Sequence, residues 1–120
     1  MHPRVKQEVL IIDRGKWQLI KPIGYIEFLK LMKHSFCVYT DSGGIQEETS
    51  FLGVRCYTLR ENTERPVTCS LGTNTLLTAE VINGNNWAKP ENSTVSKSTS
   101  IPLWDGKSAS RIVEHFIFTN

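Results

Sequence analysis

Apolar residues along the chain fall into short segments with two different spacings. Residues 17–20, 36–40, 54–59 and 75–78 are short apolar or β-branched runs, which are typical of strands. Tyr25, Phe28, Leu29 and Met32 recur at the three- and four-residue spacing of a helix with one buried face. This spacing predicts a helix over residues 25–34.

Two further helices are expected downstream. Residues 44–52 precede Gly53, and a glycine just beyond the last turn is a common helix terminator. Ile45, Thr49 and Leu52 share the face of this helix that is expected to pack on a sheet. Residues 108–118 predict the last helix. The apolar face of that helix contains Ala109, Ile112, Val113 and Phe116.

The elements alternate as strand, helix, strand, helix, strand, which predicts an α/β fold. Helices between consecutive strands favour a parallel sheet covered by helices, a Rossmann-like three-layer arrangement. Residues 5–16 fit either the end of a helix or a strand. Residues 83–100 are rich in Asn, Ser, Thr and Lys, and we expect a loop or a disordered insert there.

Composition narrows the class of protein. A chain of 120 residues is at most one domain, and its net charge of +2 is too small to predict a nucleic-acid or membrane partner. Three cysteines without metal-type spacing indicate reduced thiols and a cytoplasmic location. No apolar run reaches the roughly 20 residues of a membrane span, and the N-terminus lacks a signal-peptide core. The three histidines are scattered, so we expect no metal and no cofactor.

The candidate chemistry begins at a glycine turn, which reads TDSGG and follows the strand expected at residues 36–40. Ligands of parallel α/β sheets bind beyond the carboxyl ends of the strands, and the amides of a helix N-terminus favour anions. Gly43 and Gly44 let a ligand approach the backbone, and Ser42 is placed to cap the helix or to donate to a phosphate. The alternative is a plain strand-to-helix turn.

Two charged groups extend this site. Glu48 lies one helical turn beyond Gly44, where its carboxylate is placed to accept hydrogen bonds from the two hydroxyls of a ribose. The loop LRENTERP after the next strand supplies Arg60 and Arg65, and an arginine fork suits a diphosphate. The alternatives are a solvated glutamate near a helix N-terminus and a surface loop whose charges pair with one another.

The motifs TDSGGIQEE, TLRENTERP, LGTN and LWDGKSASRIV, in this order and spacing, resemble the C-terminal part of the non-hydrolysing UDP-N-acetylglucosamine 2-epimerases. The segment KPIGYIEFLKLMK and the opening HPR are also similar to that family. The resemblance runs from His2 to about Val113. It implies the C-terminal half of a GT-B arrangement, in which two Rossmann-like domains face a cleft.

The family interconverts UDP-N-acetylglucosamine and UDP-N-acetylmannosamine by eliminating UDP and adding it back with the opposite configuration at C2. The resemblance implies that residues 1–120 are a partial UDP-binding domain and that the ligands are UDP and UDP-N-acetylhexosamines. Matching the motifs assigns the diphosphate to Ser42, Gly43, Gly44 and Arg65, the ribose to Glu48, and the uracil to Phe28. Arg65 would also stabilise the leaving UDP, and His2 matches a histidine implicated in a regulatory substrate site.

The sequence also departs from the family pattern. Family members are about three times longer, and the motifs that match here do not include the N-terminal domain with its catalytic lysine and acidic residues. We therefore expect no catalytic residue in this chain beyond Arg65 and no turnover from it alone. Arg55 stands where the family usually has a proline.

The resemblance further implies that part of the family sheet is missing, which would expose a strand edge. We therefore expect low stability, or a homodimer or another association through that edge. Two alternatives to an epimerase stay open: a non-catalytic UDP-sugar-binding module or inactive remnant, and, fitting the motifs less well, a glycosyltransferase of similar fold.

Overall fold

The computed structural model describes residues 18–83 and 101–118 of the chain. Three short parallel strands form one sheet in the order β1-β2-β3. They span Val38–Thr40 (β1), Cys56–Thr58 (β2) and Asn74–Leu76 (β3). Val38 pairs with Cys56 and Cys56 with Asn74, so each strand follows its neighbour in the same direction. The parallel α/β arrangement expected from the alternating pattern is confirmed.

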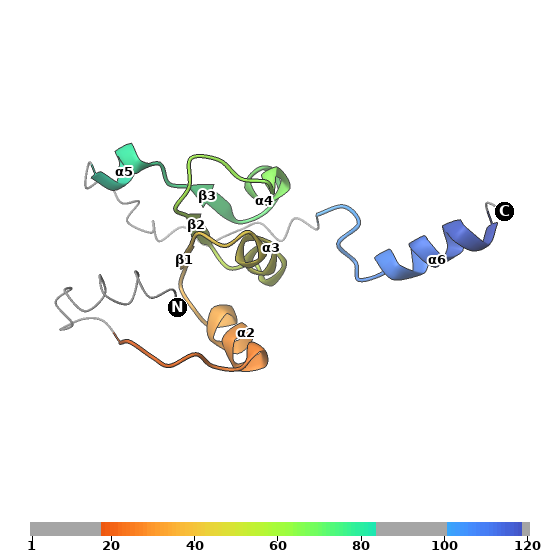
Figure 1. Ribbon diagram of the computed structural model, residues 1–120, viewed down its shortest axis with the longest axis horizontal. Coiled ribbons are helices and arrows are strands. Elements are labelled where there is room, and N and C mark those ends of the chain that lie inside the picture. The colour runs from red at the N-terminus through yellow and green to blue at the C-terminus, as the bar shows by residue number, and fades with distance from the viewer. Residues whose placement is uncertain (1–17, 84–100, 119–120) are drawn as a thin grey trace.

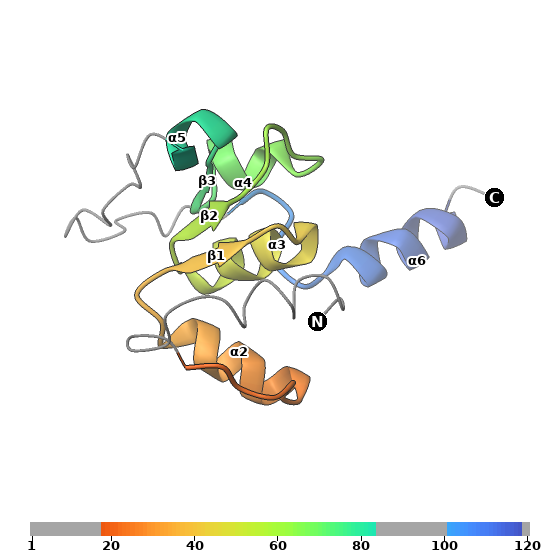
Figure 2. The ribbon, with the colours of Figure 1, turned by 60° about the vertical axis from the view of Figure 1, so that its left-hand side comes forward.

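Five helices are described, namely α2 (Tyr25–Lys33), α3 (Gly43–Leu52), α4 (Pro66–Ser70), α5 (Ala79–Asn83) and α6 (Ser108–Phe118). α3 contacts all three strands, α4 packs on β3, and α2 packs on α3. Figures 1 and 2 show α2, α3 and α4 arranged in the same spatial order as β1, β2 and β3. α3 therefore sits at the centre of the assembly, where it packs on the sheet and is flanked by α2 and α4.

The ends of α3 follow from its sequence. Gly53 adopts a left-handed backbone with φ of 71°, and its amide reaches the carbonyls of Ser50 and Thr49. This is the glycine termination expected from the sequence, which a residue with a side chain would adopt less readily. At the other end the helix begins at Gly43, one residue earlier than predicted.

Several predicted elements differ from the structure. The strands have three residues each, shorter than the apolar runs that predicted them. The strand expected at 17–20 is wrong for residues 18–20, which are irregular, with Leu19 50% and Ile20 48% exposed. Trp17 and residues 5–16 lie outside the described residues, as do 84–100. The pattern also missed α4 and α5, because five residues are too few to show an apolar helical period.

The interior is unusually polar around α3. Met32, Val54, Cys56, Tyr57, Leu77 and Ile101 are its buried apolar residues. Gln46, Thr49, Thr58 and Thr68 are completely buried beside them. Buried polar side chains need hydrogen-bond partners, so this core is held together by specific bonds as well as by apolar contact.

One hydrogen-bonded network accounts for most of these polar groups. The hydroxyl of Thr63 (2.6 Å) and Nδ2 of Asn74 (3.1 Å) both donate to Oε1 of Gln46. Thr58 donates to Oδ1 of Asn74 at 2.6 Å, and Nδ2 of Asn74 donates to the hydroxyl of Thr68 at 3.1 Å. We call these five residues the Gln46 network. It joins α3 to β2, β3, α4 and the loop before α4.

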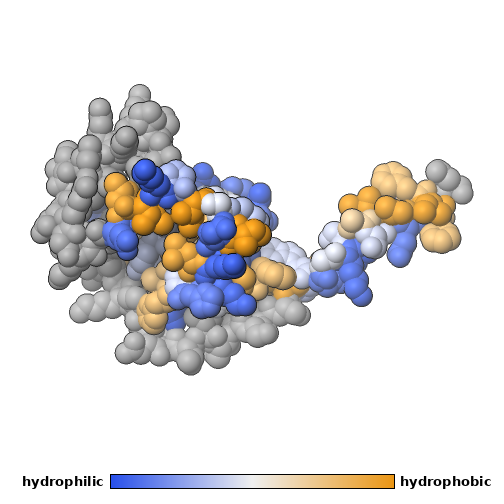
Figure 3. All heavy atoms as spheres, turned by 90° about the horizontal axis from the view of Figure 1, so that it is seen from below, coloured by the Kyte–Doolittle hydropathy of each residue, from blue (hydrophilic) through white to orange (hydrophobic). Residues whose placement is uncertain are grey.

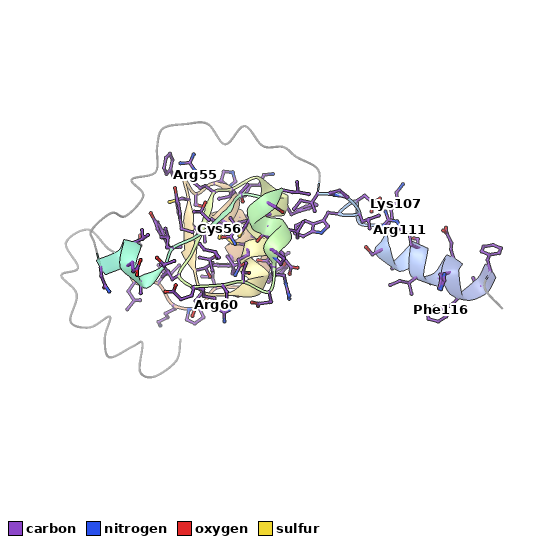
Figure 4. The ribbon with its side chains drawn as sticks, turned by 90° about the horizontal axis from the view of Figure 1, so that it is seen from above. Arg55, Cys56, Arg60, Lys107, Arg111 and Phe116 are labelled. Atoms are coloured by element: carbon purple, nitrogen blue, oxygen red, sulfur yellow. The ribbon has the colours of Figure 1, made fainter. Side chains whose placement is uncertain are left out.

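Arg55, where the resemblance leads one to expect a proline, lies at the amino end of β2. Its guanidinium lies 5.9 Å from the centroid of the Phe36 ring, a cation–π contact. Its carbonyl also accepts the amide of Val38 at 2.9 Å. Figure 4 shows Arg55 and Arg60 at opposite ends of β2, with Cys56 between them. Arg60 thus lies at the carboxyl end of the strand, and Arg55 at the opposite end.

The last helix, α6, extends away from the rest of the described residues (Figure 1). The helix itself is confirmed, but none of its residues is buried in the described part of the chain. Ile112, Val113 and Phe116 are 57%, 55% and 69% exposed. Figure 3, viewed from the α2 side, shows apolar side chains gathered over the globular part and again along α6. An amphipathic pattern therefore predicted the helix but not its environment.

Gly72 provides a test of packing between α3 and α4. A Cβ there would lie 2.6 Å from the carbonyl oxygen of Thr68, and Ser50 would obstruct it as well. We expect Gly72→Ala to lower the free energy of unfolding by about 1–3 kcal/mol, because the backbone must shift to admit the methyl group. Chemical denaturation of the purified chain measures this loss.

Gly44→Ala is the matched control, since a Cβ at Gly44 meets nothing within 4 Å. Alanine is the better helix former by roughly 1 kcal/mol, so this variant is expected to be as stable as the wild type or more so. Equal unfolding free energies for the two variants would contradict the packing described for Gly72.

Candidate functional site

The glycine turn lies at the carboxyl end of β1, where α3 begins. Ser42 has an extended backbone at the N-cap position, and its side chain makes no capping hydrogen bond. Its amide donates to the hydroxyl of Thr40 at 3.0 Å. The first turn of α3 contains no acidic residue. The amino end of α3 thus presents backbone donors and the positive end of the helix dipole, as an anion requires.

The loop before α4 approaches this turn closely. A Cβ at Gly43 would lie 2.6 Å from Oε1 of Glu64, whereas Gly44 is open. A hydrogen bond from its own backbone amide, together with the charges of Arg60 and Arg65, lowers the pKa of Glu64. This carboxylate is therefore ionised at neutral pH beside the amino end of α3. Of the two glycines, Gly44 offers the unobstructed approach to the backbone.

Glu48 lies on α3, and its side chain faces α2. The hydroxyl of Tyr25 donates to Oε1 of Glu48 at 3.1 Å. The other carboxylate oxygen, Oε2, is buried and has no hydrogen-bond partner among the described residues. Both side chains line a groove of about 400 Å³. The remaining residues around this groove are Leu29, Glu47, Phe51, Leu52 and Trp104. A carboxylate at the wall of a largely apolar groove of this size is typical of a small-molecule site.

Arg65 is held in place by both its backbone and its side chain. Nε lies 3.0 Å from Oε1 of Glu47, the residue before Glu48, in an ion pair whose side chains are 40% and 42% exposed. The Arg65 amide donates to Thr63 at 3.0 Å, and its carbonyl accepts from Thr68 at 2.7 Å. Thr63 and Thr68 belong to the Gln46 network, so that network fixes the backbone from which the guanidinium extends.

The other arginine of the loop is engaged differently. Arg60 forms an ion pair with Glu64 at 3.0 Å, and both side chains are about half exposed. For this pair the alternative interpretation of the sequence, a surface loop whose charges pair with one another, describes the structure. Arg65 reaches across to α3 instead, and so it is the arginine of this loop that joins the candidate site.

The structure thus brings Ser42, Gly43, Gly44, Glu48 and Arg65 together around the first turns of α3. Phe28 is half-buried on α2 and does not line the groove. His2 lies outside the described residues. Within residues 18–83 and 101–118, no group of three His, Cys, Asp or Glu side chains is arranged to hold a metal ion.

Sequence reasoning missed three residues of this region. Tyr25 was assigned to a buried helix face but is 61% exposed, because its hydroxyl extends to Glu48 instead of packing inward. Glu47 and Gln46 were not singled out. Gln46 is three residues before Thr49 on the expected inner face of α3, so a polar residue on an apolar face was the available signal.

The described helices include none that is long and apolar enough to cross a membrane. The three cysteines, Cys37, Cys56 and Cys69, are all free thiols. Burial raises the pKa of the Cys56 thiol, which is completely buried in β2. A protonated and inaccessible thiol is a packing residue and not a nucleophile.

Comparison with known proteins identifies the fold and the family. The chain is 40% identical to the UDP-N-acetylglucosamine 2-epimerase of Methanocaldococcus jannaschii over 94% of its own length and 32% of that protein. It is 42% identical to the enzyme of the same name from Methanococcus maripaludis, over 84% of this chain and 27% of that one. The chain therefore spans about a third of the length of the curated relatives it matches.

Solved structures agree with the sequence comparison. The crystal structure of the Methanocaldococcus jannaschii enzyme in complex with UDP-GlcNAc and UDP superposes with a TM-score of 0.72 at 39% identity, covering 98% of this chain and 34% of that one. The expected α/β fold, part of a GT-B arrangement, is thereby confirmed. The profile of the family described as UDP-N-acetylglucosamine 2-epimerase matches residues 1–117. This chain belongs to the UDP-N-acetylglucosamine 2-epimerase family.

Proposed function

We propose that this chain forms the UDP-binding part of an enzyme that interconverts UDP-N-acetylglucosamine and UDP-N-acetylmannosamine. The observation that carries the proposal is the position of three groups around the first turns of α3: the glycine turn, Glu48 and Arg65. These are the groups that a diphosphate and the ribose beside it require. Membership of the epimerase family, and the UDP-GlcNAc and UDP in the related crystal structure, support this ligand class.

In the proposed complex the diphosphate lies at the amino end of α3. Ser42 and the amides of Gly43 and Gly44 donate to its oxygens, and the Arg65 guanidinium binds on the side of the loop. Elimination of UDP develops negative charge on the departing diphosphate, and donors already aligned with that charge lower the barrier. Arg65 and the α3 amides therefore both bind UDP and stabilise it as it departs.

The nucleoside extends along α3 towards the groove. Glu48 accepts hydrogen bonds from the two ribose hydroxyls, and Phe28 of α2 lies near the uracil. His2 remains the candidate for a regulatory substrate site. No residue of this chain is assigned to the proton transfer at C2, so its part in the reaction is to hold UDP and stabilise its departure.

The alternative is a UDP-sugar-binding module without catalysis of its own. The three groups around the first turns of α3 support it equally, because they account for nucleotide binding and not for the proton transfer at C2. Both candidates use the same residues for the nucleotide and differ only in turnover. We place either one in the cytoplasm, because the three cysteines are free thiols.

Titration of the purified chain with UDP, followed by amide NMR, tests the site. We expect shifts of the amides of residues 42–48 to saturate in the wild type. Arg65→Ala is expected to weaken UDP binding about 10- to 100-fold, because a hydrogen bond to a charged group is worth about 1.5–3 kcal/mol. The purified chain alone is expected to form no UDP-N-acetylmannosamine from UDP-N-acetylglucosamine.

Arg60→Ala is the matched control, since it removes the same charge from the same loop but from a residue paired with Glu64. We expect it to change UDP affinity less than about threefold, which is the scale of an exposed charge. Equal weakening of UDP binding by the two variants would show that affinity depends on net charge and not on the position of Arg65, and would contradict the role given to Arg65. A folded wild-type chain without UDP-induced shifts would contradict the proposed function.

We also propose that the chain associates through a sheet edge, as a homodimer or with another chain. In the described part of the sheet, β1 and β3 are the edge strands, and unpaired strand edges favour pairing. Sedimentation velocity over a series of concentrations is expected to show a shift from monomer to dimer. The same monomer sedimentation coefficient at every concentration would contradict the association.

A further inference from the structure

Tyr25 and Glu48 form a hydrogen bond that joins the first turn of α2 to the middle of α3. The Tyr25 ring is 61% exposed, yet its hydroxyl donates to Oε1 of Glu48 at 3.1 Å across 23 residues of sequence. The same bond raises the pKa of Tyr25 above its ordinary value, at which the phenol is already a protonated donor at neutral pH.

The carboxylate of Glu48 is only partly satisfied by this bond. Oε2 is buried without a hydrogen-bond partner among the described residues. A carboxylate has about four lone-pair positions, of which Tyr25 occupies one. About three positions therefore remain that Tyr25 does not occupy, including those of the buried Oε2.

The neighbouring residue explains why the orientation of Glu48 needs support. Glu47 carries the same charge and lines the same groove, but it is held by Arg65 at 3.0 Å. Glu48 has no cation as a partner among the described residues, and the Tyr25 hydroxyl is the donor that contacts its carboxylate there. The two adjacent carboxylates are therefore held apart by different partners, Arg65 for Glu47 and Tyr25 for Glu48.

We propose that Tyr25 is a positioning residue for ribose recognition, which holds the Glu48 carboxylate so that both oxygens accept from the ribose hydroxyl pair. The inference rests on the proposed function, because it assumes that Glu48 receives the ribose. Tyr25 itself acts through Glu48 and keeps its hydrogen bond in the complex. Its contribution is therefore confined to ligands that carry the two hydroxyls.

Calorimetric titration of the full 120-residue chain with two nucleotides tests this role. The probes are UDP and 2′,3′-dideoxyuridine 5′-diphosphate, which lacks both ribose hydroxyls. We expect Tyr25→Phe to weaken UDP binding about five- to tenfold and to change binding of the dideoxy nucleotide less than about twofold. In a Glu48→Ala background, which removes the acceptor of Tyr25, Tyr25→Phe is expected to have almost no further effect on UDP.

Tyr39→Phe is the matched control, because it removes the same hydroxyl from β1, outside the groove. It is expected to leave the ratio of UDP to dideoxy-nucleotide affinity unchanged. A Tyr25→Phe variant that weakens both nucleotides equally would make Tyr25 a packing residue and overturn the inference. UDP binding that stays within twofold in Tyr25→Phe would overturn it as well.

These outcomes separate the inference from the function on which it rests. A folded wild-type chain that binds neither nucleotide would overturn the proposed function and the role of Tyr25 with it. Wild-type binding of UDP with no dependence on Tyr25 would overturn the role of Tyr25 alone. Glu48→Ala that leaves UDP affinity unchanged would contradict the ribose assignment and therefore the positioning role.

Discussion

The buried side chain of Gln46 is the constraint on which the arrangement of the site depends. It is completely buried, and its single Oε1 accepts from Thr63 in the loop and from Asn74 in β3. A buried amide that lost these partners would pay the full cost of desolvation, so the loop and the strand must stay where they are. The helix that carries Glu48 and the loop that carries Arg65 are thereby fixed to each other at one residue.

This constraint explains how short elements hold a defined site. The strands have only three residues each, and α4 has five, so neither has much intrinsic stability. Thr63 and Thr68 nevertheless bind the Arg65 backbone on both sides, and each is bonded in turn to Gln46 or Asn74. Buried hydrogen-bonded networks specify geometry more narrowly than apolar contact does. In this network the one unpartnered group among the five named side chains is Nε2 of Gln46, within the described residues. The interior is polar at the point where the position of a charged group matters most.

Local features of the sequence predicted the backbone of the site well. The glycine turn, the helix after it and its termination at Gly53 depend on neighbouring residues, and all were expected. The partners of the charged groups were not predictable, since the Tyr25–Glu48 bond spans 23 residues and the Gln46–Asn74 bond spans 28. Alternating patterns indicate which elements form, whereas the tertiary structure decides which side chain of one element reaches another. The burial of Gln46 and the exposure of Tyr25 are both decided by the tertiary structure.

For the last helix too, the sequence predicted that the element forms but not what it packs against. The spacing of apolar residues predicted α6 correctly, and it is amphipathic, yet none of its residues is buried within the described structure. An isolated helix of 11 residues is marginal in water, because so few backbone hydrogen bonds scarcely offset the unfavourable nucleation step. The ion pair between Arg111 and Asp105 anchors its first turns to the preceding loop, but an exposed pair contributes little. The stability of α6 therefore depends on burying its apolar face, and the described part of the chain does not supply the contact that does so.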